Sequence, residues 1–187
     1  MKLEATDLPI HSETLWAVVL GALLATLSGL VATQFEAHLR RREREHDAAL
    51  FFGEILYTLE VLIGRADEAR GRGDPYGRIT IRLLSAVRRE LDIYDRNREA
   101  LYHLRDADVR VRLHNLMVRL GLGIESVRDP HEALQSLAAS AEDGAAGDLA
   151  AARERGFEFL MDSAAEIGDL LEALSRPAGR SFRSRSN

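Results

Sequence analysis

The feature that most constrains this chain is an uncharged stretch near its start. No charged residue occurs from Thr14 to Phe35, and the most apolar part runs from Leu15 to Ala32. A helix rises about 1.5 Å per residue, so about 20 apolar residues can cross the hydrocarbon core of a bilayer. We therefore predict that residues 14–35 form a transmembrane helix.

A buried core helix is the first alternative to a membrane span. Core helices of small domains usually keep a polar stripe. From Leu15 to Thr33 this stretch is interrupted by polar side chains only at Thr26, Ser28 and Thr33. A membrane span therefore explains the composition better than a core helix does.

A cleaved signal peptide is the second alternative. Its leading region should be basic, and its cleavage site should end in small residues at positions −3 and −1. Here Lys2 is the only lysine or arginine in residues 1–13, which also contain three acidic residues, and a cut after Ala32 would place Leu30 at −3. We expect the stretch to be retained as an anchor.

Basic residues follow the stretch but hardly precede it. Arg40, Arg41, Arg42 and Arg44 lie on its C-terminal side, against Lys2 alone on the other. Because basic flanks favour the cytoplasmic side, we expect a single-pass protein of the inner (cytoplasmic) membrane, with its N-terminus outside and its C-terminal domain in the cytoplasm. The same arginines either contact lipid headgroups, each worth about 1 kcal/mol, or serve only as a topology signal.

Small residues recur every four positions along the stretch, at Gly21, Ala25, Gly29 and Thr33. Such stripes let transmembrane helices approach closely, because packing drives their association in lipid. The stripe predicts self-association of the span into a homo-oligomer. The alternative is that small residues are simply frequent in an alanine-rich chain.

Composition excludes several classes of function. The chain has 187 residues, no cysteine and a net charge of −5. Without cysteine, disulfides, thiolate catalysis and cysteine-ligated metals are excluded. The slightly acidic balance argues against a nucleic-acid-binding domain. Lys2 is the only lysine, and this use of arginine together with frequent alanine fits a GC-rich bacterial genome.

The rest of the chain reads as a stalk, a bundle and a tail. Neither proline nor glycine occurs between Phe35 and Gly53, so we expect the membrane helix to continue outside the bilayer. The arginine- and serine-rich end should be disordered, and either binds anionic lipid or nucleic acid or has no role. The predicted organisation is a polar leader (1–13), a transmembrane helix (14–35), a charged helical stalk (36–51), a helical bundle (52–175) and a disordered Arg/Ser tail (176–187).

Apolar residues in the bundle region recur at helical spacing, without strand-like alternation of any length. Part of this spacing is close to the heptad of a coiled coil. The fold we predict is all-α: a single N-terminal transmembrane helix that continues into a cytoplasmic antiparallel bundle of four to five helices. Soluble helices are predicted at 52–66, 79–104, 107–128, from Pro130 onward, and at 149–174.

Motifs for catalysis or cofactor binding are missing from the sequence. A di-iron carboxylate bundle needs Glu-x-x-His on two helices, and the one such pair is Glu43 with His46, in the charged stalk. Gly121-Leu122-Gly123 lacks the third glycine and the preceding strand of a dinucleotide loop. We therefore expect no catalytic residue, metal or cofactor, and expect that the protein is not an enzyme.

The densest group of hydrogen-bonding side chains contains Tyr94, Arg98, Tyr102 and His103. One interpretation is a recognition surface or a ligand pocket between helices. The other is a capped helix face with one or two buried hydrogen bonds that fix the register of the bundle. Arg98 falls on the apolar stripe of its predicted helix, so we expect it to be paired or to reach toward the surface.

Two functions fit these expectations. The first is a membrane-anchored interaction or scaffold protein without catalytic activity, whose partners are the lipid bilayer, a further copy of itself or another protein. The second is a membrane-tethered sensor that binds a small ligand within the bundle. A pocket lined by the polar cluster would favour the sensor, and a filled core with an exposed apolar strip would favour the scaffold.

Overall fold

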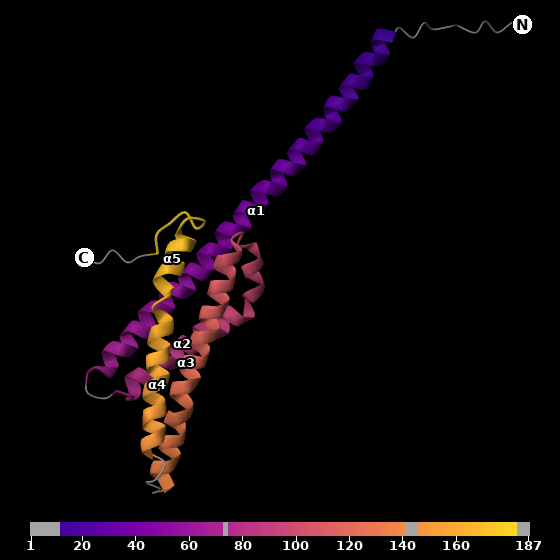
Figure 1. The fold of residues 1–187 in the computed structure, drawn as a ribbon. Coiled ribbons are helices and arrows are strands. Elements are labelled where there is room, and N and C mark those ends of the chain that lie inside the picture. Colours follow the sequence, from indigo (N-terminus) through magenta and orange to yellow (C-terminus); the bar gives the residue numbers. More distant parts are fainter. Residues whose placement is uncertain (1–11, 73–74, 141–145, 183–187) are drawn as a thin grey trace, which may run out of the picture. The chain divides into compact units, whose positions relative to one another are not determined.

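The fold was obtained as a computed structural model, which describes residues 12–72, 75–140 and 146–182. Within these residues the chain is all-helical, without a strand, as the sequence predicts. The elements, which can be followed in Figure 1, are α1 (Ser12–Arg70), α2 (Arg78–Arg96), the 3₁₀ helix η1 (Arg98–His103), α3 (Ala107–Ser140), α4 (Ala146–Ala164) and α5 (Ile167–Ser175).

The chain divides into two compact units, Met1–Glu43 and Arg44–Asn187. The first unit contains the N-terminal part of α1. Every side chain whose position is described there is exposed, because no other element packs on this part of the helix. The second unit contains the rest of α1 and all the other helices.

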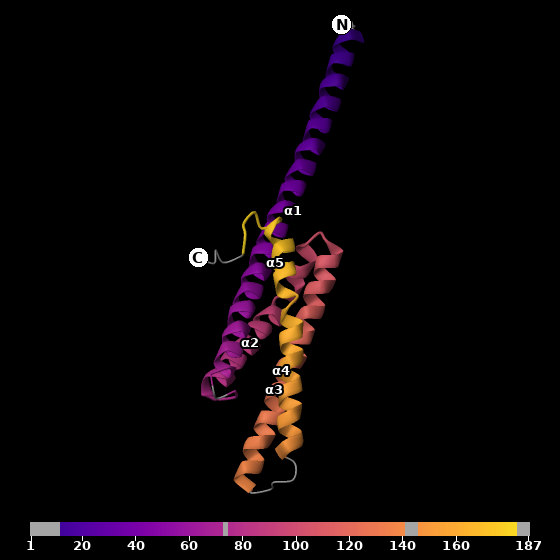
Figure 2. The ribbon, with the colours of Figure 1, turned by 60° about the vertical axis from the view of Figure 1, so that its left-hand side comes forward.

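The second unit is a helical bundle around one apolar core. Helices α3 and α4 run antiparallel and lie side by side along most of their length, and α5 continues in the direction of α4 (Figures 1 and 2). The predicted apolar stripes supply this core, because residues three and four apart share one face of a helix. Its largest fully buried members are Phe52, Leu56, Leu59, Ile63, Leu84, Tyr94, Leu113, Leu116, Leu120, Ile124, Phe157 and Leu160.

Pro130 lies inside α3, whereas the sequence pattern predicted that it starts a new helix. Proline has no N–H, so the carbonyl of Ser126 loses its helical donor at this point. Gly156 of α4 lies directly against that carbonyl: a Cβ atom added to Gly156 would be 2.6 Å from the Ser126 oxygen. The backbones of α3 and α4 therefore approach each other closely at the proline.

Two helices that the sequence pattern predicted as continuous are broken. After α2 the chain enters η1, and the Nδ2 of Asn97 donates to the carbonyl of Ile93 at 2.8 Å. The change of helix type turns Arg98 off the buried stripe, so its side chain is exposed. The last predicted helix is interrupted between Ala164 and Ile167.

Residues 176–182, here named the C-terminal strap, fold back onto α1. Gly179 has a φ of 61°, in the left-handed region that favours glycine, and it turns the chain after α5. The carbonyl oxygen of Pro177 lies 3.1 Å from Nδ1 of His46. These residues belong to the predicted Arg/Ser tail, of which residues 183–187 lie outside the described part of the chain.

Phe182 ends the strap and joins the core, with 7% of its surface exposed. Its ring lies on the α1 backbone at Gly53, where an added Cβ would be 2.1 Å from Cζ of Phe182. The guanidinium of Arg180 is 5.0 Å from the centre of that ring and donates to Glu54 at 2.7 Å. The arginine- and serine-rich composition of this segment does not reveal that one phenylalanine packs against α1.

Candidate functional site

The first candidate site is the apolar surface of α1 in the N-terminal unit. By length and composition, this helix near the start of the chain is long enough and apolar enough to cross a membrane. Such a continuous apolar surface is unusual for a helix that faces water. Its large side chains are 40 to 68% exposed: Trp16, Val19, Leu20, Leu23, Leu24, Leu27, Leu30, Val31, Phe35 and Leu39.

The polar side chains within this surface bond to the helix itself. The hydroxyl of Thr26 donates to the carbonyl of Ala22 at 2.8 Å, and that of Thr33 donates to Leu30 at 2.9 Å. Ser28 donates to Ala25 at 2.9 Å. These hydroxyl protons therefore need no water, which is the requirement that a hydrocarbon environment imposes.

The small-residue stripe lies on the open surface of this helix. A Cβ added to Gly21 or Gly29 would meet no atom within 4 Å. Ala25 and Thr33 are also exposed. No described part of this chain occupies the stripe, so its predicted role in self-association stays a prediction.

The arginines that follow this surface are exposed as well. Arg40 pairs weakly with Glu36, at 3.7 Å, and both side chains are more than half exposed. Arg41, Arg42 and Arg44 form no ion pair within the described residues. Their charges are thus directed to solvent, and the structure leaves their predicted contact with headgroups untested.

The second candidate site lies in the bundle, where the predicted polar cluster separates into a buried and an exposed part. Tyr94 is 1% exposed, and its hydroxyl is 3.0 Å from Nδ1 of His114. Burial, together with the nearby negative charge of Asp95, raises the pKa of Tyr94 to about 12. Tyr102 is 84% exposed, and His103 is exposed. Tyr94 therefore has a place in the core, and the cluster is not a single site.

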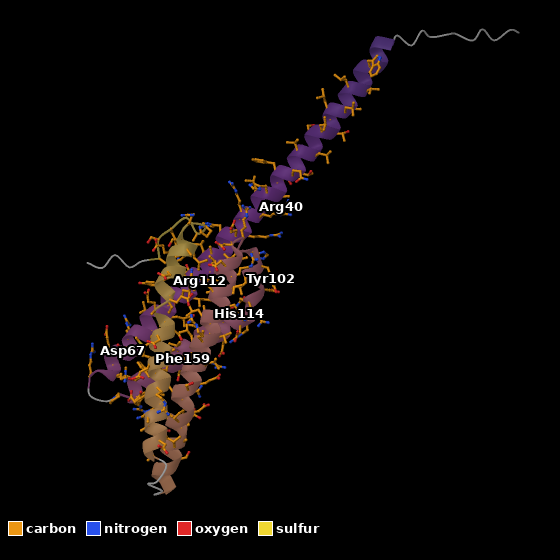
Figure 3. The ribbon with its side chains drawn as sticks, viewed as in Figure 1. Arg40, Asp67, Tyr102, Arg112, His114 and Phe159 are labelled. Atoms are coloured by element: carbon orange, nitrogen blue, oxygen red, sulfur yellow. The ribbon has the colours of Figure 1, made fainter. Side chains whose placement is uncertain are left out.

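A surface pocket of about 550 Å³ nevertheless lies beside this cluster, between the end of α2, η1 and the start of α3. Tyr102 and His114, both labelled in Figure 3, belong to its wall. This α2–η1–α3 pocket is lined by Asp95, Arg96, Arg98, Glu99, Leu101, Tyr102, Arg110, Val111, His114 and Asn115.

Charges of both signs surround the pocket. Arg96 and Arg98 face it together with Asp95 and Glu99. The guanidinium of Arg110 already has a partner within the protein, because its Nη1 donates to the carbonyl of Leu104, just after η1, at 2.6 Å. The mixed wall suits a polar ligand with both anionic and hydrogen-bond-donating groups.

The sequence pattern did not identify three of the pocket residues, which are Arg110, His114 and Asn115. Each lies on α3, well after the predicted cluster in the chain. The available signal was their position at the edge of the α3 apolar stripe, beside the buried Leu113. At this edge Arg110 and His114 are half-buried and Asn115 is exposed, and a pocket can form there.

The described residues hold no group of three or more histidine or acidic side chains that is suited to a metal ion. Family models, curated proteins and solved structures give no match to this chain. Function therefore has to be inferred from the surfaces described above.

Proposed function

We propose that the protein is a membrane-anchored interaction protein of a bacterial inner membrane. Residues 14–35 cross the bilayer once, with the N-terminus outside, and the helical bundle lies in the cytoplasm. The single observation that carries this proposal is the exposed apolar surface of α1, which contains ten large apolar side chains from Trp16 to Leu39. Burying this area in lipid is favourable by about 25 cal/mol for each Å² removed from water.

The interaction role follows from the tether and the bundle together. A tether confines copies to one surface and raises their effective concentration, so a weak contact suffices for assembly. The core of the bundle is filled by side chains from every helix of its unit. We propose that the bundle is presented to a protein partner, or to a second copy through the stripe of Gly21, Ala25, Gly29 and Thr33.

Native mass measurement tests the assembly. The full-length protein is extracted in mild detergent, and its mass and any co-purifying protein are determined. We expect either a stoichiometric partner or a homo-oligomer, and Gly29→Leu should dissociate an oligomer formed through the stripe, because the larger side chain separates the helices. Ala22→Leu, one residue after Gly21 and off the stripe, is the matched control. A monomer with nothing bound would contradict the interaction role.

A second candidate is a membrane-tethered sensor, favoured by the α2–η1–α3 pocket of about 550 Å³. A ligand bound there would stabilise the folded chain, by about 2.7 kcal/mol at a hundred times its dissociation constant. Thermal unfolding of the full chain against a panel of charged metabolites measures this. Val111→Arg fills the pocket from an exposed position, so it should abolish a true ligand's shift and leave the unliganded midpoint unchanged.

A further inference from the structure

One face of α3 is exposed although it carries large apolar side chains. Val111, Val118 and Leu122 are 48 to 58% exposed, and Asn115 between them is exposed as well. These four residues follow one another at steps of four, three and four, so they share one line along the helix. This line is here named the α3 seam. Other faces of α3 pack into the core of the bundle.

The spacing of the α3 seam is that of a coiled coil. Alternating steps of three and four residues mark the a and d positions of a heptad, at which one helix meets another. Val111 and Val118 then occupy d positions, and Asn115 and Leu122 occupy a positions. A single asparagine at an a position specifies the register and the number of helices in a coiled coil, at a cost in stability. Asn115 therefore fits a seam that pairs in one register.

A hollow of about 200 Å³ lies beside the seam, between α2 and α3. Val118, Gly121, Leu122 and Glu125 are among the α3 residues that line it. Residues with this spacing surround one point on the surface of a helix, and in a coiled coil four such residues form the hole that receives a side chain of the partner. Gly121 keeps the hole open, because an added Cβ would have only Leu91, at 4.0 Å, within contact distance. The seam thus carries a projecting side chain, Leu122, and a hole beside it.

The charge at the end of the seam is balanced within the chain. Glu125 occupies the next d position, where bare like charges from two copies would repel each other. Its carboxylate accepts a hydrogen bond from Nη1 of Arg88 on α2, at 2.5 Å. Two copies of the seam can therefore approach each other at this end.

We propose that the α3 seam pairs with the α3 seam of a second copy of this chain, parallel and in register. In a twofold-symmetric pair the same surface faces itself. Leu122 of each copy then enters the hole at Gly121 of the other, and the two Asn115 amides donate to and accept from each other. This pairing deepens the proposed interaction role and rests on it, because it names the partner and the surface.

The parallel direction follows from the order of residues along the seam. In register, every apolar position meets its own counterpart. An antiparallel pair centred on Val118 would instead place Val111 against Glu125. Val111 and Asn115 also line the α2–η1–α3 pocket, so the pair and the sensor alternative compete for one surface.

The size of the seam favours a second copy over a protein that diffuses freely. A stable interface buries about 800 Å² on each partner, whereas the seam offers three large apolar side chains on one helix. A contact of this size is weak between proteins in solution. Copies that share the proposed membrane anchor have a raised effective concentration, which makes a weak contact sufficient.

Disulfide formation in membranes tests the proposal. The chain has no cysteine, so Val111→Cys introduces one thiol per copy. The full-length variant is reconstituted in phosphatidylcholine vesicles at increasing protein-to-lipid ratios and oxidised with copper phenanthroline. The two thiols of a parallel pair face each other, so we expect a covalent dimer at low ratios. Phe159→Cys, an exposed position on α4 outside the seam, is the matched control and should cross-link only at high ratios, through collisions.

A second substitution in the Val111→Cys chain tests the projecting side chain. Leu122→Ala should shift half-maximal cross-linking to an about tenfold higher protein-to-lipid ratio, because it truncates a side chain at the centre of the pair. Phe159→Ala removes an exposed apolar side chain elsewhere on the bundle, so it should leave the ratio unchanged.

Equal cross-linking of Val111→Cys and Phe159→Cys would overturn the proposal, and so would an unchanged ratio after Leu122→Ala. In a mixture of Val111→Cys and Glu125→Cys chains, an excess of disulfides between the two variants would reveal an antiparallel pair and overturn it too. The vesicles contain this chain alone. Each of these failures therefore removes the seam pairing without contradicting the proposed interaction role, which the native mass measurement tests separately.

Discussion

At the scale of single residues, Gly53 decides whether the C-terminal strap can dock. A methyl group there would lie 2.1 Å from Cζ of Phe182. We predict that Gly53→Ala lowers the free energy of unfolding by about 1–3 kcal/mol, the usual cost of overpacking. Urea unfolding of the full-length protein in detergent measures this loss.

Gly64→Ala is the control for this prediction. Gly64 lies in the same helix, and an added Cβ meets nothing within 4 Å. Alanine has a better helix propensity than glycine by about 1 kcal/mol, so this variant should be at least as stable as the wild type. Equal stability of the two variants would show that Phe182 does not lie on Gly53.

His131 makes stability depend on pH. Burial lowers its pKa from the ordinary 6.5, and the positive charge of Arg153 lowers the pKa further. Below pH 6.5 the imidazole of His131 is therefore protonated in the unfolded chain while it is still neutral in the folded chain. The free energy of unfolding consequently falls as the pH falls through this range. We predict that His131→Gln reduces this slope, as measured by urea unfolding between pH 7.5 and about 5.5. His103→Gln, at an exposed position, should leave the slope unchanged, and equal slopes in all three proteins would contradict the prediction.

At the scale of elements, one carboxylate joins the break between α4 and α5 to α3. Glu166 accepts a hydrogen bond from Nε of Arg112 at 3.0 Å and another from Arg119, both on α3. Burial alone would raise the pKa of Glu166, but these two bonds outweigh it, and the pKa lies below 4.5. The stabilisation is present above pH 4.5 and is lost as the pH falls through the lowered pKa.

We predict that Glu166→Gln costs about 1 kcal/mol at pH 7, because the three side chains are partly exposed and solvent screens them. The loss should shrink in high salt. Thermal unfolding at two salt concentrations measures both effects. Glu158→Gln, an exposed change on α4, should have no effect, and a salt-independent loss at Glu166 would assign its role to packing instead.

Helices and their buried faces could be predicted from the sequence, because apolar spacing reflects the geometry of the helix directly. The stripe through Phe52, Leu56 and Leu59 is buried as predicted. The ends of the helices could not be predicted in the same way. Pro130 lies inside α3, and Gly156 of α4 packs against the carbonyl that it frees; such a contact between distant residues leaves no local signal.

The same limit applies to the candidate sites. The exposed apolar surface of α1 was predictable, because a run of apolar residues is a property of one segment. The α2–η1–α3 pocket could be predicted only as a polar cluster. Its wall combines Arg98 and Tyr102 with His114 from α3, and their proximity is created by folding.

At the scale of the whole molecule, residues 44–187 form a unit with its own core. We predict that this fragment, expressed alone, is soluble and helical and unfolds cooperatively. Its thermal midpoint should lie close to that of the full-length protein in detergent, and circular dichroism measures both. Insoluble or unfolded material would show that the N-terminal unit is needed for folding.

The central claim is that α1 anchors the chain in a membrane with the bundle inside the cell. Because the chain has no cysteine, single substitutions can be labelled without background. In intact spheroplasts, a membrane-impermeant maleimide should label Thr6→Cys directly and Glu158→Cys, an exposed position on α4, only after the membrane is opened. Labelling of neither variant before lysis would contradict the span, and labelling of Glu158→Cys alone would reverse the orientation.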